Sequence, residues 1–161
     1  MADGGLTVAR EALTAGLVAE LGPLLREAAA EVYGAPLALE ADGAAYVGLA
    51  AAGRYGVWVA RDAGGAAVGV CGMVLADRHP HVGEPAASQD VLFLARRART
   101  FVAARDFLAA VDRALLESGV VYVYRAAPAD RGVLGALYRR AGYAPAETIH
   151  VRRLAPWART T

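Results

Sequence analysis

The most informative stretch of this sequence is Leu137-Tyr-Arg-Arg-Ala-Gly-Tyr143 (LYRRAGY). These residues close a stretch of helical apolar spacing, which predicts a helix over Asp130–Ala141. Gly142 stands where a helix end favours glycine, so it predicts the stop of that helix. The segment Thr148–Leu154 (TIHVRRL) then predicts a closing strand.

Upstream of this helix, strands and helices alternate. Val120–Arg125 (VVYVYR) alternates valine and tyrosine and predicts a strand. Val102–Ser118 is amphipathic and predicts a helix that ends at Gly119. Asp90–Ala95 (DVLFLA) predicts a further strand, and His79–Ser88, which contains two prolines and a glycine, predicts the loop before it.

The N-terminal half predicts helices followed by a hairpin. Leu6–Ala9 predicts a short strand and Glu11–Tyr33 a long helix, which Gly22-Pro23 should break or restart. A second helix is expected over Ala41–Gly53, closed by its last glycine. Two apolar strands follow and are joined by turn residues typical of a hairpin: Tyr55–Arg61, Asp62–Gly65 and Val68–Ala76. This order predicts one α/β (α+β) domain over residues 1–161, with a mixed sheet and helices on its faces.

The composition excludes several classes of protein. Of the 161 residues, 57% are apolar and 20% are charged, which suffices for a buried core and argues against disorder. The formal net charge of +1 provides no global field that would draw nucleic acid or an anionic membrane. The single Cys71 excludes an intramolecular disulfide, and the three histidines lack zinc-ligand spacing. Neither a signal peptide nor a run of ~20 apolar residues is seen, so we expect a cytoplasmic protein without a metal or membrane span.

The segment LYRRAGY resembles the L-Y-x-x-x-G-F/Y segment of the GNAT acetyltransferases, and the elements from Asp90 to Leu154 follow that family's order. The segments LGPLLREAAAEVYG, YVGLAAAGRYGVWVARD and DRHPH are also similar to parts of small GNAT proteins of phages and prophages. The resemblance covers nearly the whole chain. It implies a largely antiparallel sheet with helices on both faces, and an N-acyltransferase that moves acetyl from acetyl-coenzyme A directly to an amine.

The resemblance also implies where the coenzyme binds. Arg99-Thr-Phe-Val-Ala-Ala104 aligns with the family motif R/Q-x-x-G-x-G/A, in which a loop opening a helix presents backbone N–H groups to the pyrophosphate. Val102 occupies the first Gly position and adds volume beside the phosphate path, while nearby arginines such as Arg97 can compensate. A solvated basic turn is the alternative. The implied coenzyme contacts are Phe93, Leu94 and Ala95 through the strand backbone, and Arg99, Thr100, Val102, Ala103, Ala104 and Arg105 at the turn.

Two residues are the candidates for proton transfer. The resemblance places Tyr138 where the family's tyrosine protonates the departing thiolate, although a helix tyrosine can instead simply pack on the sheet. Asp90 is the best candidate for the base, with a strand-start role as its alternative. Counting by twos, Ser88, Asp90 and Leu92 should share one face with Leu94, which would point Asp90 to the acceptor side.

The acceptor is left open by the sequence. His79 and His81 flank Pro80 and either line the acceptor cleft or form an exposed loop pair. Small amines, peptide amines, aminoglycosides and nucleobases all fit one scaffold, and a homodimer is equally open. The main rival function is a non-catalytic GNAT-fold binding or regulatory protein of a phage or prophage, and Val102 is its chief support. A nucleobase-modifying enzyme is a third alternative, against which the near-neutral charge argues.

Overall fold

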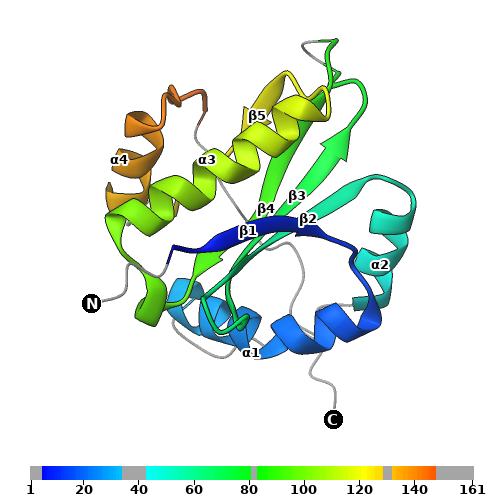
Figure 1. Cartoon of the computed structure of the whole chain (residues 1–161). Helices are drawn as coiled ribbons and strands as arrows, with labels where there is room; N and C mark the ends of the chain where they lie inside the picture. Colours follow the sequence, from blue (N-terminus) through cyan, green and yellow to red (C-terminus); the bar gives the residue numbers. More distant parts are fainter. Residues whose placement is uncertain (1–4, 34–42, 81–82, 129–131, 148–161) are drawn as a thin grey trace, which may run out of the picture.

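One five-stranded sheet organises the chain, for which the computed structural model describes residues 5–33, 43–80, 83–128 and 132–147. The elements in chain order are β1 (Thr7–Glu11), α1 (Ala15–Tyr33), α2 (Gly43–Ala51), β2 (Tyr55–Arg61), β3 (Ala67–Ala76), β4 (Ala86–Leu94), the 3-10 turn η1 (Arg96–Ala98), α3 (Phe101–Glu117), β5 (Tyr122–Tyr124) and α4 (Gly132–Arg140) (Figure 1). The strands lie in the order β1-β2-β3-β4-β5. The first four are antiparallel, and β5 alone runs parallel to its neighbour β4. The predicted mixed, largely antiparallel sheet is confirmed.

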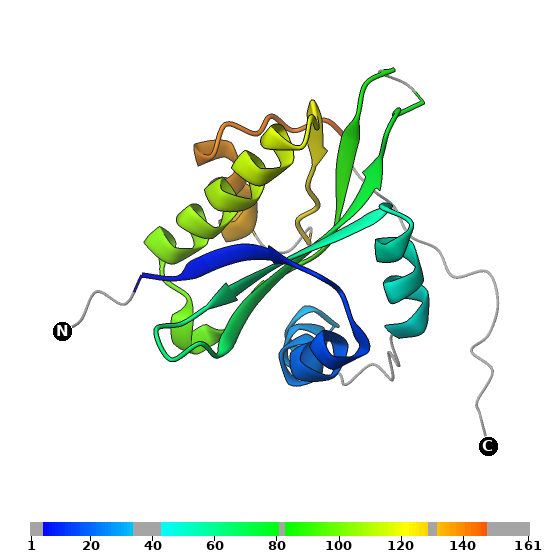
Figure 2. The ribbon, with the colours of Figure 1, turned by 45° about the vertical axis from the view of Figure 1, so that its right-hand side comes forward.

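Helices cover both faces of the sheet, with α1 and α2 on one side and α3 and α4 on the other (Figure 2). Each face has its own apolar core. One contains Leu17, Leu21, Leu24 and Ala28 of α1 packed on the strands, and the other contains Phe107, Val111 and Leu115 of α3 around Trp58. The central strands are apolar on both faces because both are covered by helices.

The prediction that Gly22-Pro23 would break the first helix is wrong. Helix α1 runs from Ala15 to Tyr33 with Pro23 inside it. Proline removes one backbone hydrogen bond, at a cost of about 3 kcal/mol. Leu17, Leu21, Leu24 and Ala28 recur at helical spacing on both sides of the proline and are all buried. Their burial, at roughly 1.5–3 kcal/mol for each leucine, outweighs the local penalty.

The predicted helix stops and the hairpin are confirmed. Gly53, Gly119 and Gly142 all have positive φ and follow α2, α3 and α4. After α4, for example, the N–H of Tyr143 donates to the carbonyl of Tyr138, which closes the helix end. Between β2 and β3, the carboxylate of Asp62 accepts from the backbone N–H groups of Gly64 and Ala66.

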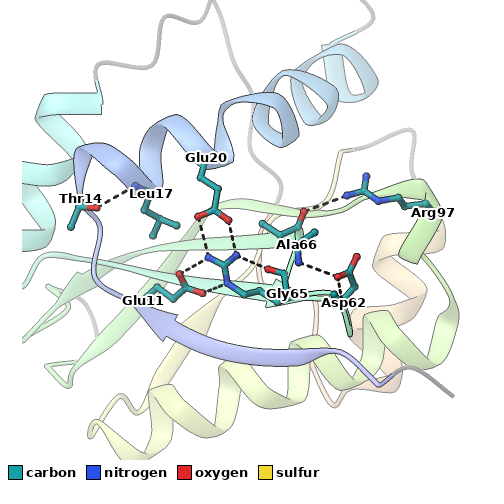
Figure 3. Close-up of polar contacts among 11 residues, drawn as sticks. Glu11, Thr14, Leu17, Glu20, Asp62, Gly65, Ala66 and Arg97 are labelled. Carbon is teal, nitrogen blue, oxygen red and sulfur yellow. Dashed lines mark hydrogen bonds and ion pairs between the residues drawn. The ribbon is translucent and has the colours of Figure 1, made fainter. Parts of the chain in front are cut away.

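An ion-pair network ties the first strand to the first helix. The guanidinium of Arg61 pairs with Glu11 at 2.8 Å and with Glu20 at 2.6 Å, and it donates to the carbonyl of Gly65. Figure 3 shows Glu11, Glu20 and Gly65 converging from β1, α1 and the hairpin turn.

Several boundaries differ from the sequence predictions. Strand β4 begins at Ala86, inside the predicted loop, because its first residues pair with both Ala76 of β3 and Tyr122 of β5. Strand β5 is three residues long, since its pairing with β4 stops at Ser88. The predicted closing strand Thr148–Leu154 lies outside the described residues. Among the helices that are described, none has the length and apolarity to cross a bilayer.

Candidate active site

An opening between β4 and β5 is the first feature of the site. The two strands pair through Ala86–Tyr122, Ala87–Val123 and Ser88–Tyr124. Beyond Ser88, no strand of the described residues pairs with this edge of β4. The side chains around the opening lie on both faces of the sheet, with Asp90 on one face and Gln89 on the other.

The backbone of β4 presents specific groups to this open edge. The N–H of Ala95 donates to the carbonyl of Val68 on β3 at 2.8 Å. In an antiparallel pair the backbone N–H and C=O groups of successive residues point alternately towards and away from the partner strand. The backbone groups of Phe93 therefore also point to β3, while those of Leu92 and Leu94 point to the opening. Of the three residues expected to meet the thioester through their backbones, Leu94 alone is therefore in the right phase. The amide of Ala95 is bonded to β3, and the coenzyme contacts expected of Phe93, Leu94 and Ala95 stay a prediction.

A β-bulge at Asp90 changes which face of the sheet the following side chains of β4 point to. Met73 pairs with Gln89 and Gly72 with Val91, so Asp90 is an extra residue without a partner on β3. As a result, Asp90 and Val91 both point to the α1 face, and Gln89 points to the α4 face. The expectation that Asp90 shares a face with Leu92 and Leu94 is wrong, because both leucines pack on the α3 side. Counting by twos fails where one residue is inserted.

On the α1 face, Asp90 lies at the centre of a tyrosine cluster. Its carboxylate is exposed and accepts a 2.8 Å hydrogen bond from the hydroxyl of Tyr55 on β2. Tyr46 of α2 contacts Tyr55 edge to face, with ring centroids 5.0 Å apart. The Tyr55 ring reaches Asp90 across β3 at Gly72, where a Cβ atom would overlap the hydroxyl and lie 2.8 Å from Cζ. The site thus depends on a glycine in the middle of a strand.

The tyrosines in this cluster are held in the protonated form. Burial raises the pKa of Tyr55 far above its usual value, and the negative charge of Asp90 raises it further. Burial also raises the pKa of Tyr46, again with a contribution from Asp90. Both phenols therefore remain hydrogen-bond donors near neutral pH, and the Tyr55 hydroxyl donates to Asp90.

On the opposite face, Tyr138 of α4 points to the same bulge. Its hydroxyl lies 2.9 Å from Oε1 of Gln89 and 3.2 Å from the carbonyl of Ala126, which follows β5. The side chain is 6% exposed. Burial raises the pKa of Tyr138 to about 12, partly offset by Gln89 and by the positive charge of Arg125. Tyr138 is a neutral phenol beside the β4–β5 opening.

Arg125 connects this tyrosine to a buried polar network. None of the Arg125 side chain is exposed. It donates to Asp112 of α3 at 2.6 Å, to the hydroxyl of Tyr143 at 2.8 Å and to Oε1 of Gln89 at 3.3 Å. The hydroxyl of Tyr143 in turn donates to Asp112 at 2.8 Å. The network joins α3, β4, β5 and the end of α4.

The predicted phosphate turn opens helix α3. Thr100 caps the helix, and its side chain accepts from the N–H of Ala103 at 3.0 Å. The N–H of Ala104 donates to the carbonyl of Thr100, which begins the helical ladder. The N–H groups of Phe101 and Val102 have no partner one turn earlier, as at any helix start. The turn therefore presents two donors and the positive end of the helix dipole.

The side chains of this turn differ in what they offer a phosphate. Arg99 is paired in bidentate fashion with Glu31 of α1 at 2.8 and 3.1 Å, and it donates to the carbonyl of Leu94 at 2.9 Å. Arg105 is exposed and pairs with its neighbour Asp106. The Val102 side chain is 54% exposed. Arg105 is thus the more accessible cation, while Arg99 braces the turn against α1.

Of the two histidines predicted to line the acceptor cleft, His79 alone lies within the described residues, beside the end of β5. His79 follows β3 in the connection to β4, and its ring stacks on Tyr124 with centroids 5.1 Å apart. Tyr124 is the last residue of β5, and its partner Ser88 is the last residue of β4 that pairs with β5 before the opening. His81 lies outside the described residues. Cys71 is fully buried in the sheet, within the apolar core on the α3 side.

Sequence reasoning missed four residues that define the site: Gln89, Tyr55, Arg125 and Gly72. Tyr55 and Arg125 were assigned to strands without a role, because their partners lie far away along the chain. A glycine inside an apolar strand is a recognised sign of a bulge or a close approach, and Gly72 offered that signal. No local pattern marks Gln89, since its orientation depends on the bulge.

No protein-family model and no curated protein sequence matches the chain. Solved structures do match. An aminoglycoside acetyltransferase, meta-AAC0020, from an uncultured soil metagenomic sample superposes with a TM-score of 0.77 at 16% identity, covering 97% of this chain and 100% of that one. Ribosomal-protein-alanine N-acetyltransferase from Brucella melitensis biovar Abortus 2308 has a TM-score of 0.70 at 18% identity, covering 94% and 100%.

A third structure is that of AAC(6')-Iy in complex with a bisubstrate analogue, CoA-S-monomethyl-acetylneamine. It has a TM-score of 0.68 at 16% identity and covers 94% of this chain and 99% of that one. Together these likenesses show that the chain has the fold of the GNAT acetyltransferases. The resemblance to phage proteins stays a prediction.

Proposed function

We propose that the chain is an N-acetyltransferase that moves the acetyl group of acetyl-coenzyme A directly to an amine. One observation carries this proposal. The bulge in β4 directs Gln89 and Asp90, two adjacent residues, to opposite faces of the sheet beside one opening. Tyr138 is therefore available on one side and a carboxylate on the other, which suits a reaction in which thioester and amine approach from different sides.

The coenzyme would follow the open edge of β4 to the start of α3. The N–H groups of Phe101 and Val102, with the helix dipole, would hold the pyrophosphate, and Arg105 would pair with it. Thr100, Ala103 and Ala104 shape this turn. The backbone N–H of Leu94, on the open edge, would donate to pantetheine or to the thioester oxygen.

Starting from an ammonium ion, the reaction needs three proton transfers. The acceptor arrives as an ammonium ion beside Asp90, which binds the cation and takes its first proton directly or through water. The free amine attacks the thioester carbon and a C–N bond forms, the nitrogen then loses its second proton to water, and the C–S bond breaks. Tyr138 donates its proton to the departing thiolate. Holding both substrates at one opening supplies much of the rate enhancement through orientation.

Titration of the protein with acetyl-coenzyme A and transfer of its acetyl group to a panel of small, peptide and aminoglycoside amines test the proposal. Tyr138→Phe should lower kcat by about a hundredfold with little change in coenzyme affinity, because it removes the acid alone. Tyr122→Phe is the matched control, since Tyr122 is 44% exposed on β5. Equal turnover in the two variants would return Tyr138 to a packing role.

A second candidate function is a GNAT-fold binding or regulatory protein without catalysis. It is favoured by the turn itself, because Arg99 is committed to Glu31 and Val102 replaces the expected glycine. The same titration separates the two functions. Absence of coenzyme binding at millimolar concentration would support the second one.

A further inference from the structure

The buried guanidinium of Arg125 has a consequence for the side chain of Gln89. A guanidinium carries donors alone, so the atom of Gln89 that faces it at 3.3 Å must be the amide oxygen. The amide nitrogen then points to the carbonyl of Ala126, 3.1 Å away. Arg125 is itself fixed by Asp112 and Tyr143. The orientation of the Gln89 amide is therefore determined by the network.

That orientation in turn determines the state of Tyr138. Within the described residues, the two polar atoms at hydrogen-bond distance from its hydroxyl are Oε1 of Gln89 and the carbonyl oxygen of Ala126. Both are acceptors, so the phenol donates its proton towards them. A proton donor is thus stored at the opening.

We propose that Gln89, held by Arg125, is a positioning residue for Tyr138: its amide oxygen accepts the hydrogen bond of the phenol and so holds the phenol oxygen at the β4–β5 opening. This role rests on the proposed function for the identity of the thiolate that takes the proton. In that step the proton leaves the Tyr138 oxygen and forms the S–H bond of coenzyme A. The phenolate left behind faces the cation of Arg125 until it regains a proton from water.

The charged and titratable groups around Tyr138 come from every element packed near it. They are Cys71 of β3, Asp112 of α3, Arg125 after β5 and Tyr143 after α4, with neutral Gln89 of β4 between them. Burial dominates and raises the pKa of Tyr138, while the hydrogen bond to Gln89 and the Arg125 charge lower it. A negative charge at position 89 would oppose the Arg125 effect directly.

Site-specific 3,5-difluorotyrosine at position 138 makes this testable without any enzymatic activity. Its fluorines lower the phenol's own pKa and allow the ionisation to be followed by ¹⁹F NMR. Gln89→Glu replaces the side-chain amide by a carboxylate of nearly the same shape and so adds a negative charge. The midpoint of the ionisation of residue 138, followed by ¹⁹F NMR, should therefore rise by about one pH unit or more. Ser88→Glu is the matched control, because Ser88 is exposed on the neighbouring position and its side chain faces away from Tyr138.

The kinetic arm uses the natural tyrosine. Gln89→Met keeps the side-chain length but removes the acceptor, and kcat should fall about tenfold with the KM for acetyl-coenzyme A nearly unchanged. An unchanged ¹⁹F midpoint in Gln89→Glu, or an equal rise in Ser88→Glu, would overturn the inference. A raised midpoint in a protein that transfers no acetyl group would support the Gln89 contact and refute the proposed function, so the two failures are distinct.

Discussion

Replacing Gly72 by alanine tests whether Tyr55 and Asp90 form one unit. A Cβ atom at this position would overlap the Tyr55 hydroxyl, lie 2.8 Å from its Cζ and lie 2.9 Å from Cγ1 of Val91. Tyr55 is 5% exposed and packed in the core, so its ring cannot move away without breaking the 2.8 Å hydrogen bond to Asp90. The substitution should damage packing and the acceptor side of the site together.

The expected loss of stability in Gly72→Ala combines the cost of overpacking with the loss of the Tyr55–Asp90 hydrogen bond. Forced overpacking costs about 1–3 kcal/mol, and a hydrogen bond to a charged acceptor contributes about 1.5–3 kcal/mol. Because Asp90 is exposed, water replaces part of that bond. We therefore expect the free energy of unfolding to fall by about 2–4 kcal/mol in Gly72→Ala.

Urea unfolding of Gly72→Ala, Tyr55→Phe and the double variant measures this as a cycle. Tyr55→Phe removes the overlapping hydroxyl as well as the bond, so the double variant should lose about 1 kcal/mol less than the sum of the single losses. Gly48→Ala is the matched control, since nothing lies within 4 Å of a Cβ there. A loss below about 0.5 kcal/mol in Gly72→Ala, or strict additivity, would refute the reasoning.

Three further predictions concern the coenzyme turn and alkaline pH. Val102→Gly should tighten coenzyme A binding in calorimetry by removing volume beside the phosphate path, whereas Val133→Gly, at the equivalent second position of α4, should not. Arg105→Ala should weaken binding more at low salt than at high salt, because a phosphate contact is screened, with exposed Arg113→Ala as its control. The pKa of Tyr138 is raised from 10.0 to about 12, so the protonated form favours folding. The resulting stability, on the order of 2–3 kcal/mol, is present below pH 10 and lost as pH rises to about 12, and urea unfolding of Tyr138→Phe should lack this part of the loss.

Local chemistry made much of the fold predictable. The ends of α2, α3 and α4 were correctly placed because glycine takes positive φ without a steric penalty, wherever the helix packs. The hairpin between β2 and β3 was predictable because Asp62 and the glycines form the turn within five residues. Tyr138 and Asp90 were selected from the LYRRAGY segment and the strand start, and both lie beside the opening.

Contacts between distant residues decided what the sequence did not show. Pro23 is tolerated within α1 because the leucines on either side of it are buried against the sheet, a gain that propensity does not include. The bulge at Asp90 exists through pairing with β3, and one inserted residue reverses every assignment made by counting along β4. Arg125 reads as the end of a strand, yet it is the centre of a network spanning α3, β4 and Tyr143. The helices, the strands and the glycines that end the helices could be predicted because the energies that place them are local. The set of side chains that meet at the opening depends on long-range packing, so it is visible in the folded structure and not along the chain.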